Sequence, residues 1–110
     1  MAFAAYHNIT GSTGINIELI APGSDVGEIQ SIMIANTHAT ADATVSLFIQ
    51  DEPTAAATKT FYILSTVAIP SDTSLLLDNS TVLSFDNSSN GYGLYLTVGS
   101  SDTLDVMINR

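Results

Sequence analysis

Apolar and polar side chains alternate most clearly between Glu28 and Gln50, where two short segments flank a small polar turn. Aliphatic residues of one parity occupy each segment: Ile32 and Ile34 before the turn, and Val45, Leu47 and Ile49 after it. Successive side chains of a strand point to opposite faces, so this spacing is typical of two half-buried strands. The pattern predicts an antiparallel hairpin in which Ile34 pairs with Leu47, since a slip by one residue would turn one aliphatic set outward.

The same register places Met33 opposite Phe48 on the second face of the predicted hairpin. An ordinary solvated sheet face would carry polar side chains at such positions. We therefore expect this face to be covered, either by a second core layer of the same domain or by a neighbouring molecule. Met33 and Phe48 are accordingly candidate interface residues.

Further strand signals recur along the chain, with polar and glycine-bearing turns between them. Thr60 to Ile69 has no fully polar face, so we expect this strand to be central or to bend. The other expected strands are Phe3 to Ile9 (a short strand or an arm within residues 1–14), Ile15 to Ile20, Thr73 to Leu77, Val82 to Phe85, Gly93 to Val98 and Leu104 to Ile108.

Helical periodicity is missing from this pattern, because no window keeps apolar residues at helical spacing for three turns. Short strands at regular spacing indicate an all-β sandwich or barrel. The pattern predicts an all-β fold, a single β-sandwich domain over residues 1–110 with about eight or nine antiparallel strands. That number is compatible with a jelly roll, although the spacing leaves the connectivity open.

Charge narrows the choice of partners. The 110 residues are 45% hydrophobic but only 12% charged, and Lys59 and Arg110 stand against eleven Asp and Glu, for a formal net charge of -9. A surface that neutralises phosphates needs several lysines or arginines, so the composition argues against nucleic acid and anionic membranes as partners. With so few charges the surface must consist largely of hydroxyl, amide and small apolar groups, which suits a subunit that packs against others.

Cysteine is absent, which excludes disulfides and thiolate metal sites. The first ten residues lack the basic region and the sustained apolar core of a signal peptide, and no later run has the length of a membrane helix. We therefore expect the chain to be made in the cytosol and to stay outside membranes.

The residues that could carry catalysis do not form a recognisable pattern. Asp51 and Glu52 adjoin on a loop, so their carboxylates point apart and make a poor acid and base couple. His7 and His38 are too far apart in sequence to form a metal-ligand pair by spacing. No strand-turn-helix nucleophile elbow is present either. We expect a protein that is not an enzyme, with no catalytic residues and no cofactor.

One turn resembles part of a metal site. Asp86, Ser88 and Asn90 place oxygen ligands at alternating positions before Gly91, as in the first half of a calcium loop. Thr97 stands where an EF-hand needs a bidentate carboxylate, and the flanking segments are expected strands. An ordinary hairpin turn is therefore the expected structure, and calcium is the weaker alternative.

The four tyrosines Tyr6, Tyr62, Tyr92 and Tyr95 are candidate recognition residues, because tyrosine combines a large contact area with a polar tip. Tyr62 lies in the expected long strand, and Tyr92 lies between Gly91 and Gly93. A glycan-binding module would use such tyrosines together with Asp and Asn from the same loops. Packing in the core or at the rim of the fold is the alternative.

From Glu28 onward the order of features resembles a group of small all-β virion proteins of tailed bacteriophages. The segments that carry the resemblance are IQSIMIAN, ATVSLFI, VAIPSDTSLLL, VLSF and GLYLTVGSSDTLDVMIN. The chain resembles these proteins in a strand that ends in Ala35-Asn36, in the turn over Ile69 to Thr73 and in the final Leu-x-Val at Leu104. Relatives often carry a Glu-x-Gly-Asp turn before the penultimate strand, whereas this chain has Asn87 to Gly93.

This resemblance implies a structural component of the virion, a repeated subunit that packs on the head as a decoration or cement protein, or on the neck or tail. Its partners would be copies of itself and other virion proteins. The alternative is a module of a phage fibre or spike that binds a host glycan or receptor.

Overall fold

The computed structural model describes residues 4–10, 14, 16–23, 29–51, 59–79, 83, 85–88, 91–100 and 103–109. These residues form eight β-strands: β1 (Ala4–Ile9), β2 (Asn16–Ile20), β3 (Ser31–Asn36), β4 (Ala43–Gln50), β5 (Thr60–Ile69), β6 (Thr73–Leu77), β7 (Gly93–Ser100) and β8 (Leu104–Asn109). No helix among the described residues is long and apolar enough to cross a membrane.

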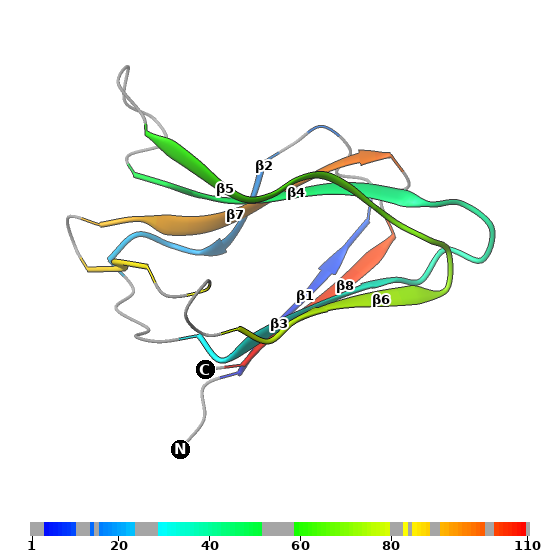
Figure 1. Ribbon diagram of the computed structural model, residues 1–110, viewed down its shortest axis with the longest axis horizontal. Helices are drawn as coiled ribbons and strands as arrows, with labels where there is room; N and C mark the ends of the chain where they lie inside the picture. The colour runs from blue at the N-terminus through cyan, green and yellow to red at the C-terminus, as the bar shows by residue number, and fades with distance from the viewer. Residues whose placement is uncertain are drawn as a thin grey trace.

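Two four-stranded antiparallel sheets lie face to face (Figure 1). Sheet A has the order β1-β8-β3-β6, and sheet B has the order β2-β7-β4-β5. The strands pair in a nested way, β1 with β8, β2 with β7, β3 with β6 and β4 with β5, as if one long hairpin had been rolled up. The prediction of an all-β sandwich is confirmed.

The core fills the space between the sheets with aliphatic side chains that alternate along the central strands. Because the inward positions come from both sheets, each set covers the apolar face of the other. The hydrophobic side chains that are less than 2% exposed on these strands are Ile32, Ile34, Ala43, Val45, Leu47, Leu94, Leu96, Val98, Leu104, Val106 and Ile108.

The predicted hairpin between residues 28 and 50 is wrong. β3 pairs with β6 and β8 in sheet A, whereas β4 pairs with β5 and β7 in sheet B, so the intervening turn crosses between the sheets. Ile34 and Leu47 are both fully buried, but they face each other's sheet and are not neighbours in one sheet. Parity alone could not separate these arrangements, because both bury the same two aliphatic sets.

The crossing turn is built on Asn36, the last residue of β3, whose side chain points inward and is 2% exposed. Its amide nitrogen donates to the carbonyl oxygens of Ala41 at 2.9 Å and Ile69 at 3.0 Å, and its amide oxygen accepts the backbone N–H of His38 at 3.1 Å. His38 Nδ1 in turn accepts the N–H groups of Thr40 and Ala41. These bonds satisfy backbone groups of the crossing turn and of Ile69 at the end of β5.

β5 is the edge strand of sheet B, so the expectation of a central strand is wrong, while the alternative of a bent strand is confirmed. Its register on β4 shifts twice between Val45 and Phe48. At the first shift, two residues of β5 lie opposite Ser46. Thr66, one of the two, has a φ of 55°, and its N–H donates to Ser46 Oγ at 2.9 Å. Such bulges bend an edge strand and increase its twist.

The strand expected over Val82 to Phe85 is not among the strands of the described residues. Leu83 instead donates its backbone N–H to the carbonyl oxygen of Asn79 at 3.2 Å, the bond of a helical turn. The Leu83 side chain is buried in the core. At Leu83 the apolar signal therefore indicates burial correctly but not the backbone conformation, while Val82 and Ser84 lie outside the described residues.

Candidate functional site

The outer face of sheet A carries an apolar stripe across all four strands. The register aligns Tyr6 of β1 with Met107 of β8, Met107 with Met33 of β3, and Met33 with Leu76 of β6. Tyr6 is 71% exposed and Leu76 is 57% exposed, while the two methionines are half-buried. At about 4.8 Å between strands, the stripe extends about 14 Å from β1 to β6. These four residues are called the sheet A stripe below.

Polar side chains border the stripe. On one side Asn8 donates to the Asp105 carboxylate at 2.6 Å, and on the other Asn109 donates to Ser31 Oγ at 3.3 Å. Asp105 is the one charged side chain among the described strand residues of this face. An apolar centre with a polar rim is the usual anatomy of a protein–protein contact.

The outer face of sheet B carries a second row, formed by Glu18 of β2, Tyr95 of β7, Phe48 of β4 and Tyr62 of β5. The Phe48 ring centroid lies 5.2 Å from that of Tyr62 and 6.0 Å from that of Tyr95. Phe48 and Tyr95 are almost fully buried, and Tyr62 is 59% exposed. We call these four residues the sheet B row, which is a compact aromatic cluster with one ring open to solvent.

Glu18 closes this row at the edge strand β2. The Tyr95 hydroxyl donates to a Glu18 carboxylate oxygen at 3.4 Å, which is a long hydrogen bond. Burial raises the pKa of the Tyr95 phenol above its usual 10.0, and the Glu18 carboxylate raises it further. Both effects disfavour a phenolate at this position. The phenol therefore remains a hydrogen-bond donor toward Glu18 at neutral pH.

The turn before β7 is a hydrogen-bonded structure in its own right. Asp86 Oδ1 accepts the Ser88 N–H at 3.0 Å, and hydrogen bonds from the Ser88 side chain and backbone lower the pKa of this carboxyl. The Asn87 side chain is buried and donates to the carbonyl oxygens of Ala21 and Tyr92. The turn is thus tied to the end of β2 and the start of β7.

These bonds bear on the calcium candidates. Asp86 and Ser88 bond to each other, while Asn90 lies outside the described residues. Among the residues that are described, no three His, Cys, Asp or Glu side chains gather as a metal site would require. The neighbours of β7 are β2 and β4, so the expectation that this turn closes a hairpin is wrong, while the absence of metal stays a prediction.

The structure separates the four predicted interface residues. Phe48 and Tyr62 lie together on the outer face of sheet B, whereas Met33 lies on the opposite face of the sandwich, in sheet A. The predicted pairing of Met33 with Phe48 is therefore wrong. Tyr92 is half-buried and packs edge-on against Phe61, with a centroid distance of 5.8 Å, so it is less accessible than Tyr62.

Sequence reasoning missed two members of the sheet A stripe, Met107 and Leu76, and identified Tyr6 as a recognition candidate without placing it in line with Met33. A signal was present, because each is apolar at the parity opposite to the core residues of its strand, as Met33 is. Reading that signal required the strand order, which aligns the four residues. Without the order, each is a single exposed apolar residue, and such residues are common on proteins.

The histidines and the loop carboxylate occupy separate structural positions. His7 faces inward on β1, and its Nε2 atom is buried without a hydrogen-bond partner in the described structure. His38 serves the crossing turn. Asp51 accepts the backbone N–H of Lys59 through its carboxylate at 2.7 Å, and Glu52 lies outside the described residues. The described residues thus bring none of these groups together around one point.

Comparison with protein-family models, with curated proteins and with solved structures finds no match for this chain. The class that the observations define is an all-β sandwich of two four-stranded sheets. Each sheet presents an apolar or aromatic row on its outer face. Function must therefore be argued from these two surfaces and from charge.

Proposed function

We propose that this protein is a non-enzymatic structural subunit of a bacteriophage particle, which packs against copies of itself and other virion proteins on the head, neck or tail. The observation that carries this proposal is the sheet A stripe, in which apolar side chains cross an otherwise polar sheet face from edge to edge. A soluble monomer gains nothing from exposing Tyr6 and Leu76 in one line, whereas a neighbour would bury them.

Two further observations support this proposal. The strand order β1-β8-β3-β6 over β2-β7-β4-β5, with its nested pairs, supports a jelly roll, and viral capsid proteins are among the proteins built on that architecture. The analogy is one of fold alone, and it raises the prior for a particle component without assigning a site. The net charge of -9 would limit uncontrolled association of the apolar surfaces.

The test combines self-association with particle binding. Purified protein would be followed by analytical ultracentrifugation over a range of concentrations, and its binding to phage particles that lack it would be measured by co-sedimentation. Met33→Glu places a charge in the centre of the sheet A stripe, where Met33 is half-buried and its neighbours are apolar. We expect this variant to lose association in both assays while its circular dichroism spectrum stays unchanged.

Ser74→Glu provides the matched control, since Ser74 is exposed on the same sheet but lies outside the stripe. It adds the same charge and should retain most of the association. A wild-type protein that stays monomeric and binds neither head nor tail material would contradict the proposal. Equal losses in the two variants would show that added charge, not the stripe, is responsible.

A glycan-binding module of a fibre or spike is the second candidate, and the sheet B row favours it. Tyr62 offers an exposed ring, and the hydroxyl and amide groups of Thr60, Gln50 and Thr97 lie on the same face. Tyr62→Ala separates the two candidates better than a change at the half-buried Tyr92. Loss of cell adsorption by assembled particles would favour glycan binding, whereas normal adsorption would favour the structural role.

A further inference from the structure

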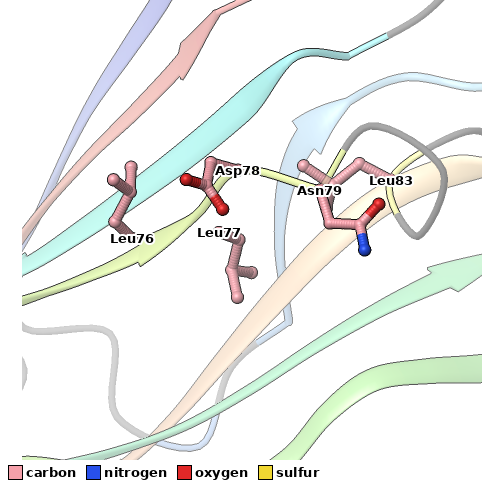
Figure 2. A pocket seen from close by; sticks show the side chains of 5 residues that line it. All are labelled: Leu76, Leu77, Asp78, Asn79 and Leu83. Atoms are coloured by element: carbon pink, nitrogen blue, oxygen red, sulfur yellow. The ribbon is translucent and has the colours of Figure 1, made fainter.

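A pocket lies where the edge strand β6 of sheet A ends. Leu76, Leu77, Asp78, Asn79 and Leu83 line a volume of about 180 Å³ (Figure 2). Leu83 is 1% exposed and forms part of the wall, while Leu76 is 57% exposed and also terminates the sheet A stripe. The pocket is thus continuous with the surface proposed above to contact neighbours.

Most of the wall is hydrocarbon, and the charge lies on one side. Asp78 is exposed, and Figure 2 shows its carboxylate on the side of the pocket where Leu76 and Leu77 lie. No residue that the structure describes donates a hydrogen bond to this carboxylate or forms an ion pair with it. A group that combines an aliphatic stem with a positive end would satisfy both parts of the pocket.

We propose that this pocket receives a lysine side chain of a partner protein, with the stem along the leucines and the ammonium group at the Asp78 carboxylate. A lysine has a flexible four-carbon stem and a compact charge, and a pocket of about 180 Å³ has room for both. The net charge of -9 draws a basic partner toward this surface and repels an acidic one.

The same charge argues that the partner is a different protein and not a second copy. Lys59 is the one Lys or Arg among the described residues, and it precedes β5 at the edge of sheet B, whereas the pocket lies at the end of β6 in sheet A. A copy of this chain would also bring a further net charge of -9 to the contact. That the partner is a virion protein rests on the proposed function. That the pocket accepts a lysine side chain rests on the pocket residues alone.

The test uses n-butylammonium chloride, which is the lysine side chain without its backbone, and n-butanol, which has the same stem without the charge. Leucine methyl resonances of the full chain would be followed by NMR during each titration. We expect saturable shifts of the Leu76, Leu77 and Leu83 methyl groups, with n-butylammonium binding about two- to five-fold more tightly than n-butanol, as an exposed ion pair allows. Added salt should reduce this preference.

Asp78→Asn should abolish the preference for the ammonium ligand. Asp72→Asn is the matched control, since Asp72 is an exposed acid directly before the first residue of β6, whereas the pocket lies after its last residue. This variant should keep the preference for n-butylammonium. Equal binding of the two ligands, an unchanged preference in Asp78→Asn, or leucine methyls that respond to neither ligand would each overturn the proposal. Because no particle is involved, this outcome is independent of the assembly assay described above.

Discussion

The buried amide of Asn36 offers the sharpest test of why β3 and β4 belong to different sheets. We consider Asn36→Ala, which removes the amide and leaves the backbone of the crossing turn in place. The carbonyl oxygens of Ala41 and Ile69 and the N–H of His38 would then lose their partner. Water reaches the half-buried turn residues His38 and Ala41 more easily than it reaches Ile69, which is 2% exposed.

The magnitude follows from these three hydrogen bonds. A typical intramolecular hydrogen bond contributes about 0.5–1.5 kcal/mol, and an unsatisfied buried acceptor costs about 1–3 kcal/mol. With Ile69 counted as buried and the other two groups as partly hydrated, we expect Asn36→Ala to lower the free energy of unfolding by about 2–4 kcal/mol. At a urea slope of about 1.5 kcal/mol per molar, the unfolding midpoint would fall by about 2 M.

Asn8→Ala is the matched control, because it makes the same chemical change at an exposed side chain of the same sheet. The exposed Asn8 side chain donates a hydrogen bond to Asp105, and exposed substitutions of this kind usually stay within about 0.5 kcal/mol. Urea unfolding followed by circular dichroism measures both variants. If the Asn36→Ala midpoint falls no further than that of Asn8→Ala, the amide does not hold the crossing turn and the reasoning fails.

Two further predictions concern β7 and the turn before it. Gly91→Ala should lower the free energy of unfolding by about 2 kcal/mol or more, because a Cβ atom there would clash with the backbone carbonyl of Asp86. Gly99→Ala is the control, since a Cβ atom at that position would make only ordinary contacts. Thermal melts compare the two variants, and similar melting temperatures would contradict the prediction. Because the folded-state pKa of Tyr95 is raised, the unfolded chain releases this proton first, so the stability it contributes is intact below about pH 10 and is lost as pH rises through the folded pKa. Tyr95→Phe should weaken that decline in alkaline urea titrations, and an identical decline in both proteins would argue against the influence of burial and of Glu18.

The fold class could be predicted from the sequence because burial follows the alternation of side chains within each strand. Ile32, Ile34 and Leu47 are buried as their parity indicates. What parity could not give is the sheet to which each strand belongs, since two facing strands and two paired strands bury the same residues. The deciding feature was Asn36, whose inward amide is visible only once its acceptors are in place.

The candidate surfaces depended even more on the strand order. Met33 was identified as an outward apolar residue, but its true neighbours in the stripe come from strands β1, β6 and β8. The register shift in β5 places Tyr62 opposite the buried Phe48, and a bulge is a property of two strands and not of one. Local sequence patterns contain no such information.

The nested strand pairing has a consequence for the folding of the chain during its synthesis on the ribosome. β8 separates β1 from β3 in sheet A, and β7 separates β2 from β4 in sheet B, so neither sheet has its centre until the final two strands have been made. The first six strands would meanwhile expose strand edges and apolar faces, which makes partly synthesised chains prone to aggregation. Contacts between distant parts of a chain also form slowly. Folding should therefore follow synthesis instead of accompanying it, and a chain that stops before β8 would lack a central strand and not merely an edge.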